Sequence, residues 1–161
     1  MCNWGHVKIR KAEGAELKKF CDMVGLVVLN AAEGQNGYAD PNEITYIAET
    51  AADGMPVGCC RIDDFTDDRC SVSYYLCKQF EYDEEHFADM LFATLRAVFD
   101  EFDVVKAVCK PVKIRYHRQK FFPDSGFVVE VLYACVNPNG EYLVDANYVI
   151  YREEFEKRYG N

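Results

Sequence analysis

Six cations stand together in a segment that contains no acid, although the chain as a whole is acidic. The segment runs from Val104 to Pro123, whereas the whole chain has 27 acids against 18 Lys and Arg, a net charge of −9. Such a cluster can gather phosphate groups, because each positive charge attracts phosphate oxygens. The alternative interpretation is a solvated face that balances acids elsewhere. The cations are Lys106, Lys110, Lys113, Arg115, Arg118 and Lys120.

Thiols are abundant, but their spacing does not predict a metal site. The chain has eight cysteines and no Cys-x-x-Cys, and His6, His86 and His117 do not group with them. Zinc sites need such grouped ligands, so we expect no structural metal. Most of these cysteines fall in apolar strand patterns and are interpreted as small buried hydrophobic residues with free thiols. Cys77 has no histidine at a recognisable distance, so a nucleophilic role is not favoured.

Length and composition predict one globular domain that spans residues 1–161. Apolar residues make up 50% of the chain, and 11 Tyr and 11 Phe stand against one Trp, which favours a sheet-rich interior. An acidic chain does not bind nucleic acid or an anionic membrane through bulk charge. The longest apolar run covers only residues 25–29, and the start lacks a secretion-signal pattern. We therefore expect a cytoplasmic protein.

The hydrophobic pattern alternates between strand and helix periods. The strongest helix covers residues 83–102, where Phe87, Leu91, Leu95, Val98 and Phe102 step by 4, 4, 3 and 4. Asp83 is its expected N-cap. The expected strands are 6–12, 44–51, 55–62, 70–77, 104–109, 127–136 and 142–151. The other expected helices are 13–29, 113–122, which Pro123 and Gly126 would end, and 152–159.

The resulting order is β-α-βββ-α-β-α-ββ. The helix at 83–102 joins the third strand of a meander to the strand at 104–109, which lets these two strands lie parallel. The pattern predicts an α+β fold with a mixed, mostly antiparallel sheet flanked by helices.

In this order and spacing the chain resembles GNAT-family N-acetyltransferases, nearest the branch that includes ribosomal-protein acetyltransferases. The resemblance covers nearly the whole chain, and its motifs are specific in combination rather than singly. The pieces that carry it are Val7-Lys8-Ile9-Arg10-Lys11-Ala12, Asp53-Gly54-Met55-Pro56-Val57-Gly58, Ser73-Tyr74-Tyr75-Leu76, Gly126-Phe127, Asn139-Gly140-Glu141, and Tyr148-Val149-Ile150-Tyr151-Arg152-Glu153.

The resemblance implies that acetyl-CoA is the co-substrate and lies in a gap where two strands splay apart. Its pantetheine would pair with backbone at Tyr75, Leu76 and Cys77. Its diphosphate would lie at the start of the long helix. The residues expected there are His86, Phe87 and Ala88, with Lys113 and Arg115 of the cation cluster holding phosphate as well.

The resemblance also implies direct attack of a primary amine on the thioester, with the amine either on a small molecule or at a protein N-terminus. Glu49, beside the expected acceptor cleft, is the first candidate for the general base, and Asp63 and Asp64 are alternatives. Tyr116 is the candidate for the acid that protonates the leaving thiolate. Family members often dimerise, so a homodimer is left open.

The chain departs from the family where the phosphate loop should be. The family pattern Gln/Arg-x-x-Gly-x-Gly/Ala needs glycines for close backbone approach to phosphate, and residues 77–88 contain none. Glu81, Asp83, Glu84 and Glu85 instead put four acids at the helix start, where they would repel a phosphate. The alternative hypothesis is therefore an inactive GNAT-like module that has lost CoA binding and works by binding or regulation.

Overall fold

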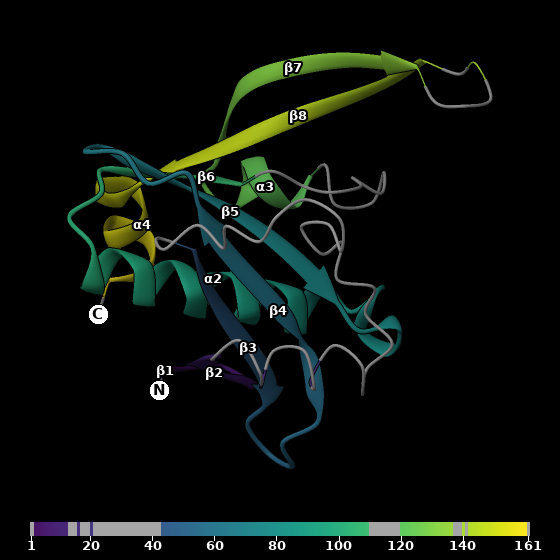
Figure 1. Cartoon of the computed structure of the whole chain (residues 1–161), viewed down its shortest axis with the longest axis vertical. Helices are drawn as coiled ribbons and strands as arrows, with labels where there is room; N and C mark the ends of the chain where they lie inside the picture. The colour runs from purple at the N-terminus through teal and green to yellow at the C-terminus, as the bar shows by residue number, and fades with distance from the viewer. Residues whose placement is uncertain are drawn as a thin grey trace, which may run out of the picture.

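The computed structural model describes residues 2–12, 16, 20, 43–109, 120–136, 140 and 142–160. Its strands form one sheet in the order β1-β2-β3-β4-β5-β6-β8-β7 (Figure 1). The strands are β1 (Cys2–Trp4), β2 (Val7–Lys11), β3 (Ile44–Thr50), β4 (Pro56–Asp63), β5 (Arg69–Leu76), β6 (Lys106–Cys109), β7 (Val128–Val136) and β8 (Tyr142–Tyr151). The helices described are the 3-10 turn η1 (Lys78–Phe80), α2 (Glu84–Glu101), α3 (Phe121–Asp124) and α4 (Arg152–Tyr159).

Among the strands that the structure describes, only β5 and β6 run parallel, and every other neighbouring pair is antiparallel. The predicted α+β class with a mixed, mostly antiparallel sheet is therefore confirmed, and so is the parallel pair joined through α2. β2 to β8, α2 and α4 fall within two residues of their predicted bounds. Of the expected first helix, only Glu16 and Phe20 are described, and both are helical. The rest of that prediction lies outside the described residues.

Two local expectations need correction. β1 was not predicted, because three residues are too few to show a period, yet Cys2–Trp4 pairs with β2. The second correction concerns Pro123, which was expected to end a helix and instead lies inside α3. A proline is tolerated in a first helical turn, since N–H groups there need no intrahelical partner. Residues 113–119 of that expected helix lie outside the described part of the chain.

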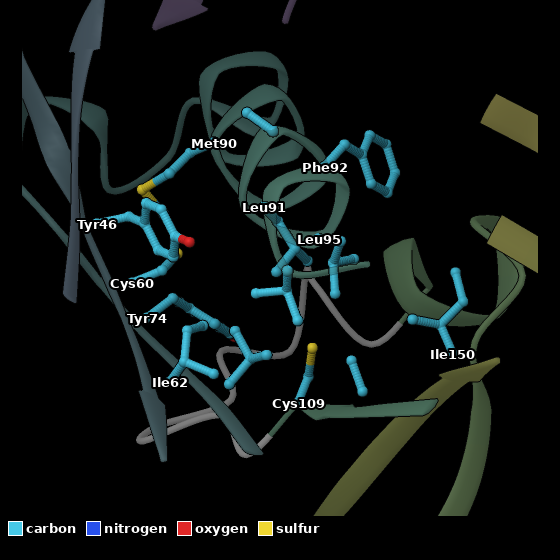
Figure 2. Packing of buried hydrophobic residues seen from close by; sticks show 14 of the residues in the cluster. Tyr46, Cys60, Ile62, Tyr74, Met90, Leu91, Phe92, Leu95, Cys109 and Ile150 are labelled. Atoms are coloured by element: carbon cyan, nitrogen blue, oxygen red, sulfur yellow. The ribbon is translucent and has the colours of Figure 1, made fainter. Parts of the chain in front are cut away.

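One face of the sheet packs against α2, and this face holds the main hydrophobic core. α2 begins after the Asp83 N-cap, whose carboxylate accepts the backbone N–H of His86, so the capping prediction is confirmed. Figure 2 shows side chains from the strands, among them Cys60, Ile62 and Tyr74, meeting Leu91 and Leu95 of the helix. The same cluster includes Phe122 of α3 and Phe155 of α4. These three helices therefore cover one face.

The opposite face of the same strands is buried as well, but it is more polar. Phe20 packs there against Ile47 and Cys59, with Tyr75 at the edge of this small cluster. Because successive residues of a strand point to opposite faces, Arg61, Asp63, Ser71 and Ser73 share this face. Along β4 and β5, one face of the sheet is therefore apolar and the other carries polar side chains.

Candidate active site

The candidate site lies along β5, beyond the four residues that pair with the described part of β6. The two strands pair from Arg69 to Val72 of β5, opposite Lys106–Cys109. From Ser73 to Leu76, β5 pairs only with β4 among the described residues. An open strand edge offers backbone N–H and C=O groups that an extended ligand can bind as an added strand would. The chain that follows Cys109 lies outside the described residues, so the gap expected between the two strands stays a prediction.

Gly58 lets β4 approach this stretch of β5 very closely. It lies opposite Leu76 in the strand register. A Cβ atom at this position would lie 2.1 Å from the carbonyl oxygen of Tyr75, much closer than two such atoms can come. The position of this stretch of β5 therefore depends on a glycine in the neighbouring strand.

The three residues expected to hold the pantetheine lie along or just after this stretch of β5, but they are not equivalent. Tyr75 and Leu76 belong to β5 and are half-buried. Cys77 follows the strand, and its N–H donates to the carbonyl of Val57 over 2.9 Å. Its carbonyl accepts the N–H of Phe80, also over 2.9 Å. The backbone groups of Cys77 are therefore already used within the chain, unlike what a pantetheine-binding role would need.

The Tyr75 phenol lies on the face opposite α2, beside Arg61. Burial raises the pKa of Tyr75 above its ordinary value, and Arg61 opposes that shift in part. The phenol therefore stays protonated at neutral pH and remains a hydrogen-bond donor.

At the start of α2, the place expected for a diphosphate is held by the chain's own carboxylate. Asp83 Oδ1 accepts the His86 N–H over 3.0 Å, and Asp83 Oδ2 lies 2.8 Å from His86 Nδ1. Partial burial raises the pKa of Asp83, but the hydrogen bonds and charge of His86 outweigh it and hold that pKa below its usual value. The helix start is thus already capped by a negative charge.

The residues expected around that diphosphate have other contacts. The ring of His86 stacks at an angle on Phe80, with 4.8 Å between ring centroids. Phe87 is fully buried and packs on Tyr74, so its side chain belongs to the core. Ala88 packs half-buried against the same core. His6 Nε2 lies 2.9 Å from Glu85 Oε1, so one of the local acids is paired.

The cation cluster is only partly described. Lys106 Nζ donates to Glu130 Oε1 over 2.9 Å, and this hydrogen bond raises the pKa of Lys106. Lys120 is exposed next to α3. Lys113 and Arg115, as well as the candidate acid Tyr116, lie outside the described residues. Their roles stay predictions.

Glu49 lies on β3, two strands away from β5, which corresponds to roughly 10 Å at the usual strand spacing. Its carboxylate faces Arg10, with 3.7 Å between Oε1 and Nη2. Glu49 therefore lies on the same sheet as the expected gap but does not border it. Its role as general base stays a prediction.

A buried serine of β5 is a residue to which the sequence analysis assigned no role. Ser73 is the first residue of β5 beyond the described pairing with β6, and it stands opposite Arg61. Arg61 in turn donates to Asp63 Oδ2 over 2.7 Å. The available signal was the alternation Ser71-Val72-Ser73-Tyr74, which puts two hydroxyls on one face of a strand inside the sheet.

In the part of the chain that the structure describes, no three His, Cys, Asp or Glu side chains converge to hold a metal ion. Cys59, Cys60, Cys70, Cys77 and Cys109 are free thiols and buried, as expected for these five positions. Among the described helices, none is both long and apolar enough to cross a membrane.

Comparison with known proteins finds likeness in structure but not in sequence. No protein-family profile matches the chain, and no curated protein sequence matches it. Its structure is similar to that of the spermidine/spermine N-acetyltransferase SpeG from Vibrio cholerae, with a TM-score of 0.70 at 12% identity. The match covers 96% of this chain and 97% of that one.

A second similar structure is FdhC, a nucleotide-linked sugar GNAT. Here the TM-score is 0.67 at 11% identity, over 98% of this chain and 93% of the other. Identities this low carry the arrangement of helices and strands and nothing about substrates. The chain therefore has the fold of the GNAT acetyltransferases.

Proposed function

We propose that this chain is an N-acetyltransferase that uses acetyl-CoA and a primary amine. The observation that carries the proposal is the mixed sheet with its parallel pair of β5 and β6, in which Ser73–Leu76 of β5 run beyond the described pairing with β6 toward the start of α2. An extended pantetheine arm fits along such a strand, because its amides can pair as an added strand would. The shared fold with acetyltransferases supports the same reaction class.

In the proposed reaction, the amine nitrogen attacks the thioester carbonyl carbon. A new C–N bond forms, the C–S bond breaks, a base takes the amine proton, and the thiolate leaves as a thiol after receiving a proton. Glu49 remains the proposed base, acting through water because of its distance from the gap, and Tyr116 the proposed acid. Neither assignment is needed for the cofactor test below.

The phosphates of CoA do not fit at the start of α2 as they would in a glycine loop. Asp83 caps the helix there, and Glu84 and Glu85 extend its negative charge. We propose that the cation cluster, Lys113 and Arg115 above all, holds the phosphates instead. A charge cluster needs no glycine, but its binding must weaken with salt.

The capped helix also favours the second candidate function, a GNAT-like module that has lost CoA binding. The two candidates differ in one measurable property. The transferase must bind acetyl-CoA, and the module must not.

The test is calorimetric titration of the purified chain with acetyl-CoA at low and moderate salt. Micromolar binding that weakens with salt supports the transferase and the cation cluster, and no binding up to millimolar concentration overturns the transferase. Asp83→Asn sharpens the test, because Asn also caps helices but carries no charge. We expect it to bind acetyl-CoA several-fold more tightly if phosphate lies nearby. Asp100→Asn, the same change near the far end of α2, is the matched control.

The acceptor is proposed only as a class, a small-molecule amine or a protein N-terminus. Because the similar Vibrio cholerae enzyme is named for spermidine and spermine, linear polyamines belong in the first acceptor panel beside N-terminal peptides, including those of ribosomal proteins. We also propose that the chain forms a homodimer and acts in the cytoplasm.

A further inference from the structure

A cavity of about 430 Å³ lies between β2 and the last turn of α2. Its volume is within the range of small-molecule sites in proteins. Ile9, Ala97 and Tyr46 form its apolar part, and of these Ile9 and Tyr46 are buried. Its charged side chains come from the strand on one side and from the helix on the other. A ligand here would therefore meet an apolar surface between two charged walls.

The cavity is separate from the proposed acetyl-CoA site. It borders the end of α2, whereas Asp83 and His86 stand at the helix start. α2 has 18 residues, which corresponds to about 27 Å along the helix axis. A ligand in the cavity therefore does not reach the start of α2, and an inference about this ligand does not depend on the proposed transferase.

The charges around the cavity are separated by sign. Arg10 and Lys11 are consecutive residues of β2, and Asp100 and Glu101 are consecutive residues of α2. Two positive and two negative charges cancel, so the net charge of the lining favours neither a cation nor an anion. A positive wall that faces a negative wall instead complements a ligand that carries both charges.

The negative wall lies at a helix end that is itself negative. α2 has no basic residue in its last turn, which contains Asp100 and Glu101. Because the helix dipole is negative at the C-terminus, carboxylates are unfavourable there and a cation is favourable. Asp100 makes no hydrogen bond or ion pair with any residue that the structure describes. An ammonium group near these two carboxylates would offset their charge.

One ion pair joins the two walls of the cavity. Lys11 Nζ donates to Glu101 Oε1, and the Tyr46 hydroxyl donates to Glu101 Oε2 over 3.2 Å. Lys11 Nζ also lies 5.6 Å from the centroid of the Phe102 ring. An ammonium has three N–H donors, so Lys11 can donate to a ligand as well as to Glu101. A ligand carboxylate can thus bind Lys11 while a ligand ammonium binds Glu101.

Arg10 is less available to a ligand than Lys11. Its Nη1 donates to Glu16 Oε1, and its Nη2 lies 3.7 Å from Glu49 Oε1. Two carboxylates therefore already face this guanidinium. Among the acids that the structure describes, only Glu101 pairs with Lys11. Lys11 is therefore the cation that would recognise a ligand carboxylate.

We propose that this cavity binds a free amino acid with an apolar side chain. Its carboxylate accepts hydrogen bonds from Lys11, and its ammonium donates to Glu101 beside Asp100. Its side chain lies against Ile9 and Ala97. A ligand with a positive charge alone would compete with Lys11 for Glu101, and a ligand with a negative charge alone would compete with Glu101 for Lys11. A zwitterion gives each of these two groups a new partner of opposite charge.

The test is NMR titration of the 15N-labelled chain with four related ligands at pH 6.5. L-leucine is the zwitterion, leucinamide keeps only the ammonium, N-acetylleucine keeps only the carboxylate, and glycine lacks the side chain. We expect leucine to bind about three- to tenfold more tightly than either singly charged analogue, the scale of one charged hydrogen bond at a partly exposed site. Glycine should bind about tenfold more weakly than leucine, because it buries no apolar side chain. Equal affinity for leucine and both singly charged analogues overturns the proposal.

Two variants separate the two charged walls. Lys11→Gln should lose the preference for leucine over leucinamide and keep the preference over N-acetylleucine. Glu101→Gln should do the reverse. Both should keep a melting temperature near that of the wild type, because an exposed ion pair contributes little to stability. Glu156→Gln, an equal charge change at an exposed residue of α4, should keep both preferences. Unchanged preferences in Lys11→Gln and Glu101→Gln overturn the proposed contacts.

The positions of the shifted amide signals distinguish this site from the proposed transferase site. Leucine should shift the signals of Lys11, Ala97 and Glu101 and leave those of Leu76 and His86 in place. The opposite pattern would show leucine at the transferase site, which overturns this inference and leaves the transferase standing. Because the titration contains no acetyl-CoA, a chain that fails to bind acetyl-CoA overturns the transferase without affecting this test.

Discussion

The two faces of β4 and β5 are both buried, but different interactions hold them. Under α2 the strands present Cys60, Ile62, Val72 and Tyr74, all part of one apolar core. On the other face the same strands present Arg61, Asp63, Ser71 and Ser73. The first face excludes water and stabilises the fold. The second retains polar groups whose burial is unfavourable for stability, which is typical of a site that binds something.

The largest effect is expected on the α2 face. Phe87 is fully buried, and its ring lies 4.9 Å from Tyr74 and 5.0 Å from Phe121. Phe87→Ala should lower the free energy of unfolding by about 3–5 kcal/mol, because it removes a large side chain and leaves a cavity. Urea unfolding measures this loss. Tyr82→Ala is the control, since Tyr82 is 70% exposed and should change stability little.

The backbone between the two faces gives the next largest effect. Gly58→Ala would place a methyl group against the Tyr75 carbonyl and push β4 away from β5. We expect a loss of about 1–3 kcal/mol in unfolding free energy, in the range of overpacking. Acetyl-CoA affinity should fall as well, because the stretch of β5 proposed to hold the pantetheine moves. An unchanged unfolding midpoint with unchanged affinity would show that the two strands tolerate the separation.

The contrast between the faces also explains what the sequence could predict. The long helix follows from the spacing of Phe87, Leu91 and Leu95, and its start from Asp83, because both signals are local. The parallel pair of β5 and β6 follows from the helix between them. By contrast, Ser73 is buried by parts of the chain that come together only in the folded structure. A serine in a strand carries no local sign of being covered.

The candidate site was therefore less predictable than the fold. Tyr75 and Leu76 lie in β5, as the strand pattern predicted, and their role in holding the pantetheine stays a prediction. Ser73 stood in the motif that carried the resemblance and was given no role, since its burial is a property of the folded structure. The acids at residues 81–85 were recognised as a departure, but sequence could not show that Asp83 and His86 bind each other.

The start of α2, at the end of the apolar face, should show a smaller effect. Asp83→Ala removes the N-cap and should cost about 1 kcal/mol, whereas Asp83→Asn should keep most of that stability. The pKa of Asp83 is lowered in the folded state, so its stabilising contribution is complete above its unfolded pKa of about 4 and is lost as pH falls through the folded value. Thermal unfolding from pH 6 to pH 2.5 should therefore show the wild type losing its advantage over Asp83→Ala. A constant difference across that range would contradict the cap.

The smallest effect concerns a thiol on the α2 face. Burial raises the pKa of Cys60 to about 12, although a hydrogen bond with Thr94 opposes the shift. In the unfolded chain this thiol ionises near pH 9, so the unfolded state gains charge first as pH rises. The contribution of Cys60 to stability is therefore complete below about pH 9 and declines from pH 9 toward pH 12. At pH 9.5 the decline is under about 1 kcal/mol.

Unfolding of the wild type and Cys60→Ala at pH 7.5 and pH 9.5 measures this decline, because other groups titrate equally in both. The stability advantage of the wild type should shrink at the higher pH. If it does not, the thiol is reached by water in the folded state, and the α2 face is less dry than its residue types indicate. The difference in stability between the wild type and Ser73→Ala should be the same at both pH values, because a hydroxyl does not titrate in this range and both chains keep Cys60.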